Sequence, residues 1–130
     1  MVNAFLSFIE KSPSAFHAVE ELCGILNENG LTALNEHSEW KLEAGRGYYV
    51  TRNRSAVIAF TVPEDAFTHF QIVASHSDSP CFKLKHTAEE TAVGAFTRLN
   101  VERYGGMIMS TWLDRPLSIA GRAIVKDGGK

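Results

Sequence analysis

A histidine and an aspartate stand two residues apart at the end of an apolar run, in the stretch IVASHSDSP of residues 72–80. Residues 69–74 predict a nearly continuous apolar strand, of the kind that lies in the centre of a sheet with both faces covered. His76 and Asp78 follow directly, and Pro80 stiffens the exit of the chain. A strand that only fills a core has no use for an imidazole and a carboxylate, so this stretch is the first candidate for a functional site.

The His-x-Asp spacing suits one corner of a metal site. Neutral imidazole is the commonest protein ligand for zinc, and open α/β sheets build sites at the carboxyl ends of their central strands. Side chains two residues apart return to the same face of an extended segment. Asp78 can therefore lie beside the His76 ring and hydrogen-bond its second nitrogen, which fixes the tautomer. The spacing alone is also compatible with a surface histidine beside a capping aspartate.

The other histidines and cysteines do not complete a zinc site. Zinc takes three or four protein ligands, and no close pairing of the finger or ribbon type occurs in the chain. His69 and His76, seven residues apart, would face opposite sides of one strand. We therefore expect the co-ligands of His76 to lie outside these 130 residues or in another subunit.

The elements that must position this corner are two helices followed by strands. Residues 3–10 predict a short amphipathic helix, and Ser12 with Pro13 predicts the start of a second one, which Asn29-Gly30 ends. From about residue 40 the apolar residues recur with period two. The predicted strands are residues 47–51 and 56–62, which form a hairpin, and then residues 69–74, 81–86, 94–102 and 117–125.

Composition excludes several classes of partner. The chain of 130 residues is 45% hydrophobic and 22% charged, as in ordinary globular proteins. Its net charge of −2 gives no electrostatic reason for binding nucleic acid or an anionic membrane. No apolar run approaches the roughly 18 residues of a membrane span, and the N-terminus lacks the basic region of a secretory signal. Cys23 and Cys81 are expected to be reduced, packed thiols, so we expect a cytoplasmic location.

The last residues, KDGGK over 126–130, predict a hairpin turn that no strand follows. A domain rarely ends with a hairpin turn that lacks its second strand. We therefore interpret the chain as part of a longer protein.

Three segments, in order along the chain, resemble the aspartyl aminopeptidase family, which are cytosolic zinc aminopeptidases with a two-metal site. FLSFIEKSPSAFHAVEELCGIL resembles the N-terminal helices of that family. ASHSDSPCFKLK resembles its first metal motif, with Ser77 where threonine is usual. NVERYGGMIMSTWLDRPLSIAGRAIV resembles the segment that leads into its inserted β domain, and this is the most specific of the three.

The resemblance implies an α/β fold with a mixed central sheet flanked by helices. Residues 1–103 would form the N-terminal part of the catalytic domain, and residues 104–130 would begin an inserted β-rich domain that serves homo-oligomer formation. His76 would ligate one of two zinc ions, and Asp78 would orient its imidazole. The other zinc ligands and a glutamate general base lie later in family members, and this chain contains none of them.

The function implied is removal of N-terminal residues, often Asp or Glu, from peptide substrates by zinc-assisted hydrolysis. Because the remaining ligands would come from the rest of the polypeptide, residues 1–130 alone are expected to be inactive. The alternative is a non-catalytic, β-rich binding or assembly module that keeps the peptidase scaffold.

Overall fold

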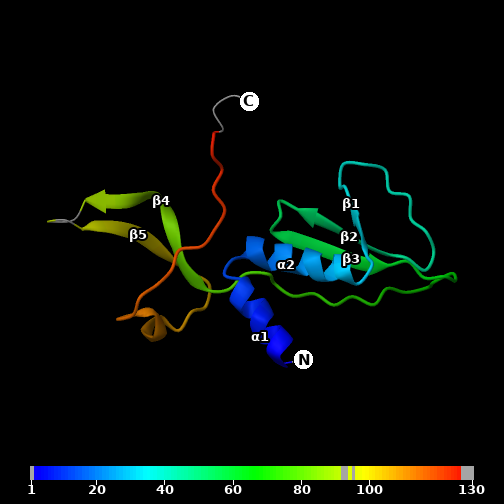
Figure 1. Ribbon diagram of the computed structural model, residues 1–130, viewed down its shortest axis with the longest axis horizontal. Helices are drawn as coiled ribbons and strands as arrows, with labels where there is room; N and C mark the ends of the chain where they lie inside the picture. Colours follow the sequence, from blue (N-terminus) through cyan, green and yellow to red (C-terminus); the bar gives the residue numbers. More distant parts are fainter. Residues whose placement is uncertain (1, 92–93, 95, 127–130) are drawn as a thin grey trace. The chain divides into compact units, whose positions relative to one another are not determined.

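Two helices and a three-stranded sheet form the first of two units into which the chain divides (Figure 1). The computed structural model describes residues 2–91, 94 and 96–126. The first unit lies within Met1–Asp78 and Ala120–Lys130, and the second within Ser79–Ile119. None of the described helices is long and apolar enough to cross a bilayer.

The two predicted helices are confirmed, with one correction at the start of the second. They are α1, Val2–Lys11, and α2, Ala15–Glu28. The residue that caps α2 is Ser14, in an extended conformation, and not Ser12. The amide of Ser12 instead donates to the Ile9 carbonyl at 3.0 Å and closes the end of α1, so Ser12 belongs to the preceding turn.

The end of α2 follows the predicted glycine signal. Gly30 has a φ of 81°, the left-handed conformation that glycine adopts without a steric penalty. Its amide donates to the Asn27 carbonyl at 2.9 Å, and the Leu31 amide donates to the Leu26 carbonyl at 3.0 Å. These bonds satisfy carbonyls of the last turn, as in a Schellman motif.

The sheet of the first unit has the order β1-β2-β3 and is mixed, as the α/β prediction requires. β2, Gly47–Arg52, pairs antiparallel with β3, Ala56–Thr61, which confirms the predicted hairpin. β1, Thr32–Leu34, pairs parallel with β2 and was not predicted from the sequence. Three residues are too few for an alternating apolar pattern to be visible.

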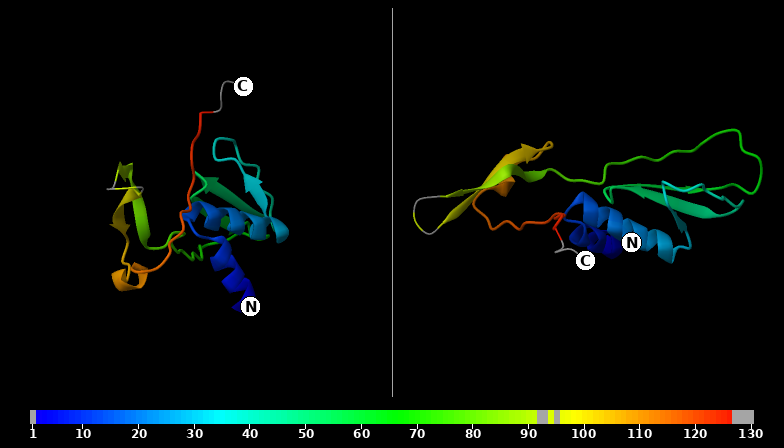
Figure 2. Two further views of the ribbon diagram at one scale, coloured as in Figure 1. Left: turned by 60° about the vertical axis from the view of Figure 1, so that its left-hand side comes forward. Right: turned by 90° about the horizontal axis from the view of Figure 1, so that it is seen from above.

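The core of the first unit lies on both faces of β2. Helix α2 covers one face of the sheet (Figures 1 and 2) and buries Val19, which is 1% exposed. The Tyr49 hydroxyl donates to Asn27 Oδ1 of α2 at 2.9 Å. On the opposite face the Tyr48 ring lies 5.9 Å from that of Phe60. Both tyrosines are buried, so β2 is covered from two sides.

The predicted strand at residues 69–74 is wrong for the described chain. Residues 63–78 return past the sheet as an irregular, extended segment (Figure 2). Ile72 is 81% exposed and Val73 is 95% exposed, so neither face is covered. A strand requires a neighbour along its hydrogen-bonding edge, and no described strand pairs with this segment.

The second unit is a two-stranded antiparallel ribbon with one short helix. β4, Cys81–Thr91, pairs with β5, Thr97–Tyr104, with a bulge between Leu84 and Glu89. The short 3-10 helix η1, Met109–Trp112, places Trp112 edge-on against Phe82, with ring centroids 5.6 Å apart.

Both strands of this ribbon overlap the strands predicted at residues 81–86 and 94–102, although Ala95 lies outside the described residues. The strand predicted at residues 117–125 is wrong: its residues are irregular and exposed, and no described strand pairs with them. Of the turn predicted at residues 126–130, residues 127–130 lie outside the description. The domain boundary at residues 103/104 stays a prediction.

Candidate functional site

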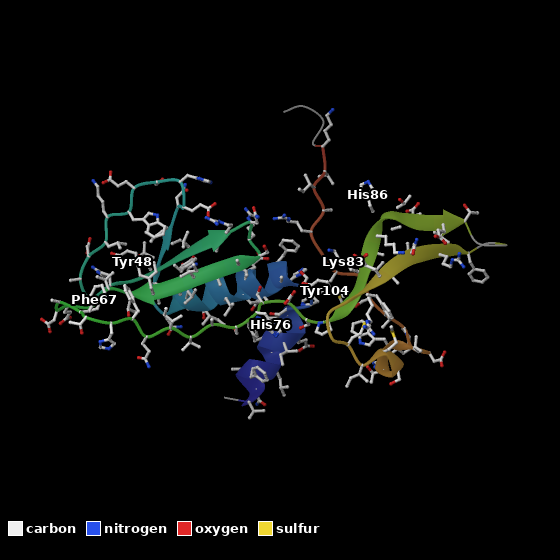
Figure 3. All side chains as sticks on the ribbon, turned by 180° about the vertical axis from the view of Figure 1, so that it is seen from behind. Tyr48, Phe67, His76, Lys83, His86 and Tyr104 are labelled. Carbon is white, nitrogen blue, oxygen red and sulfur yellow. The ribbon has the colours of Figure 1, made fainter. Side chains whose placement is uncertain are left out.

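His76 lies on the irregular segment that follows β3 (Figure 3). Its side chain is 80% exposed. Its Nδ1 atom is 2.8 Å from the backbone oxygen of Asp78 and 3.3 Å from Asp78 Oδ1. Both of these neighbours are acceptors, so they favour the tautomer that carries its proton on Nδ1. The lone pair is then on Nε2, the nitrogen that faces away from Asp78.

This arrangement fits a single zinc ligand. An imidazole whose Nδ1–H is held by a carboxylate or carbonyl, with Nε2 available, has the orientation found in metal-binding histidines. In the part of the chain that the structure describes, no three His, Cys, Asp or Glu side chains gather where they could hold a metal ion. A zinc site that included His76 would therefore need at least two ligands from elsewhere.

A contact that sequence reasoning missed ties this segment to the sheet. The Ser77 hydroxyl donates to the backbone carbonyl of Ser55 at 2.9 Å. Ser77 and Asp78 are half-buried, whereas residues 66–76 are exposed. The His-x-Asp segment thus meets the rest of its unit at the residue between the histidine and the aspartate. The acceptor is a backbone carbonyl. Because every residue has one, the sequence does not indicate which carbonyl Ser77 contacts.

The Ser55 carbonyl belongs to the tight turn between β2 and β3. The Ser55 amide donates to the Arg52 carbonyl at 3.1 Å, and the two central residues, Asn53 and Arg54, have φ values of 52° and 55°. Positive φ at both central positions is the signature of a type I′ turn, here within a three-residue loop because Arg52 pairs with Ala56. Asparagine adopts this conformation readily, but arginine does so at a cost of roughly 1–2 kcal/mol.

A second anchor holds the same turn. Arg122 donates from a guanidinium nitrogen to the Asn53 carbonyl at 2.7 Å. The Arg122 guanidinium also lies over the Phe16 ring of α2, 4.3 Å from its centroid, in a cation–π contact. Two carbonyls of the turn thus accept hydrogen bonds from residues distant in the sequence.

A cavity of about 510 Å³ lies beside α2. Its lining includes a second group of side chains that could act as ligands or nucleophiles. His17 and Cys23 line it from the helix, together with Arg54 and Arg122. The Nδ1 atom of His17 is 2.7 Å from the Ser14 hydroxyl, so this ring is already engaged within its own helix. Burial raises the pKa of the Cys23 thiol, and the Glu20 carboxylate raises it further. Cys23 is accordingly a free, protonated and half-buried thiol.

Comparisons with known proteins agree on one family. The model of the family "Aminopeptidase I zinc metalloprotease (M18)" matches residues 8–130. A probable M18 family aminopeptidase 2 of Clostridium novyi is 44% identical over 126 residues, which are 95% of this chain and 29% of that protein. Aspartyl aminopeptidase 1 of Schizosaccharomyces pombe is 42% identical over 127 residues, 95% of this chain and 27% of that protein.

Solved structures agree with these sequence relatives. The mApe1 structure of Chaetomium thermophilum has a TM-score of 0.88 and 35% identity, over 97% of this chain and 29% of that one. An mApe1 dodecamer of S. cerevisiae has a TM-score of 0.74 and 27% identity, over 87% of this chain and 27% of that one. The chain thus spans less than a third of the length of the relatives that it matches.

The raised pKa of Cys23 predicts slow alkylation. The thiolate is the nucleophile, so a raised pKa leaves less of it at pH 8, and half-burial restricts access further. We expect iodoacetamide to modify Cys23 about 10-fold more slowly in the native protein than in guanidinium, as followed by mass spectrometry of its peptide. Glu20→Gln should speed the native reaction, because it removes the second cause of the shift. Equal rates in the native and unfolded protein would contradict this account.

Proposed function

This chain belongs to the aminopeptidase I zinc metalloprotease (M18) family, and we propose that the full-length protein carrying it is a zinc-dependent aminopeptidase to which His76 supplies one metal ligand. The observation that carries the proposal is the geometry of His76, whose Nδ1 lies 2.8 Å and 3.3 Å from two oxygens of Asp78. Those contacts leave Nε2 to bind a metal.

Each of the two residues has its own task. His76 would bind the metal through Nε2, and Asp78 would accept a hydrogen bond from Nδ1–H, which sets the plane of the ring. Zinc bound there would supply Lewis-acid chemistry for the hydrolysis of a peptide bond. We propose two zinc ions per active site, with the remaining ligands and a glutamate general base supplied by the rest of the polypeptide.

The substrate class and the assembly are parts of the same proposal. Relatives named aspartyl aminopeptidase support N-terminal acidic residues, Asp or Glu, as the ones removed from peptide substrates. The dodecameric mApe1 structure supports a homo-oligomer. We also propose that residues 1–103 belong to the catalytic domain, that residues 104–130 begin an inserted β-rich domain, and that the protein is cytoplasmic.

The first prediction from the proposed function concerns residues 1–130 alone. We expect no hydrolysis of aspartyl-p-nitroanilide by this piece, because His76 has no co-ligands within the described residues. The measurement is a zinc-supplemented assay beside the full-length protein at equal molar concentration. Turnover by the piece that a chelator abolishes would show that the described residues do complete a metal site.

The second prediction concerns His76→Ala in the full-length protein. Loss of the imidazole removes one zinc ligand, so activity on the acidic substrate should fall by about 1,000-fold or more and one zinc should bind more weakly. Turnover and zinc content by mass spectrometry are the measurements. His69→Ala is the matched control, because His69 is an exposed histidine of the same segment. Unchanged turnover in His76→Ala would remove the assignment and favour the assembly-module alternative.

The third prediction concerns Asp78→Asn. The amide keeps the shape of the side chain but loses its charge, and the Asp78 backbone oxygen still faces Nδ1 at 2.8 Å. We therefore expect a smaller loss than for His76→Ala, about 10- to 100-fold in activity or zinc affinity. A loss as large as that of His76→Ala would mean that Asp78 contacts the metal or the substrate directly.

A further inference from the structure

Ser77 stands between the two site residues, and its side chain makes a different kind of contact from theirs. Asp78 holds the His76 ring through atoms only two residues away, at 2.8 Å and 3.3 Å. Ser77 reaches 22 residues back along the chain, where its hydroxyl donates to the Ser55 carbonyl at 2.9 Å. The Asp78 contacts therefore set the ring relative to its own segment, and the Ser77 bond sets that segment relative to the sheet.

The burial pattern supports this division of roles. Residues 66–76 are exposed and pair with no described strand, and the chain becomes half-buried at Ser77. The Ser77 hydrogen bond therefore holds the backbone next to His76 at the point where the segment meets the sheet.

The acceptor of this bond is itself fixed. Ser55 closes the type I′ turn through its amide bond to Arg52, and Arg52 pairs with Ala56 in the hairpin register. Arg122 holds the neighbouring Asn53 carbonyl at 2.7 Å. Backbone in a sparsely populated conformation, such as Arg54 at a φ of 55°, persists where its surroundings determine it from several sides. Hydrogen bonds from within the hairpin and from Arg122 thus hold the turn.

We propose that Ser77 is a positioning residue for His76. Its hydrogen bond to the β2–β3 turn would hold the metal-binding segment in place relative to the sheet. This inference rests on the proposed function, because it concerns where His76 Nε2 presents its lone pair. A metal ligand must be placed accurately to bind well. Contacts that orient ligands typically contribute about 10- to 100-fold to metal affinity. The competing role is packing alone, in which loss of the hydroxyl would lower stability and leave zinc affinity unchanged.

The test measures zinc affinity in the full-length protein rather than activity. Metal-free protein is titrated with zinc against a chromophoric chelator, and the thermal midpoint of the metal-free protein is recorded beside it. We expect Ser77→Ala to lower the affinity for one zinc ion by about 10-fold. This is the lower end of the effect typical for contacts that orient a metal ligand, because the Asp78 contacts remain. Ser77→Thr, which keeps the hydroxyl, should retain the affinity of the unmodified protein.

Two further variants control for shape and position. Ser77→Val matches Ser77→Thr in shape and lacks the hydroxyl, so this pair keeps the test valid if Ser77→Ala does not fold. We expect Ser77→Val to lower the zinc affinity and Ser77→Thr to leave it unchanged. Ser75→Ala removes an exposed hydroxyl from the same segment and should leave zinc affinity unchanged.

The outcomes separate this inference from the proposed function. If His76→Ala weakens one zinc and Ser77→Val does not, Ser77 has no positioning role while the metal assignment stands. If the serine variants lower only the thermal midpoint, the contact is packing, and the inference is overturned in the same way. If His76→Ala leaves zinc affinity unchanged, both the assignment and the inference fall.

Discussion

The burial of β2 from both sides is the constraint on which the first unit depends. Neighbouring residues of a strand point to opposite faces, and here the neighbours are two tyrosines, Tyr48 and Tyr49, both nearly inaccessible to solvent. Tyr49 is secured to α2 through Asn27, and the Tyr48 hydroxyl accepts the Glu43 amide at 2.9 Å. Each ring thus satisfies its polar end while burying its apolar body, as buried tyrosines require.

The turn that contacts the candidate site depends on this strand. β2 fixes the register of β3, the register fixes the turn of residues 52–55, and the turn presents the Ser55 carbonyl to Ser77. The order of dependence runs from aromatic burial to hairpin geometry and from there to the histidine.

Sequence reasoning succeeded where the determining interactions are local. The hairpin, both helices and the glycine stop depend on residues within a few positions of one another, and so does the approach of Asp78 to His76. It erred at the cap of α2 because Ser12 and Ser14 are both good capping residues, and a local rule does not rank them.

The remaining errors and omissions have non-local causes. Residues 69–74 and 117–125 carry strand-like patterns, but the structure provides them with no partners among the described residues. β1 is held by its parallel neighbour rather than by its own three residues. The Ser77–Ser55 bond joins a hydroxyl to a backbone carbonyl across 22 positions, a relation that residue types do not encode.

The same distinction between local and distant interactions explains why the segment that carries His76 is so exposed in the described chain. Burying a side chain the size of Ile72 or Val73 stabilises a protein by about 1.5–3 kcal/mol, and both are uncovered in the described chain. In the proposed site the remaining ligands come from the rest of the polypeptide, so zinc binding would be coupled to the folding of that part against the first unit. In the proposed site, the contacts of Asp78 and Ser77 would together hold the His76 imidazole in one orientation for the metal.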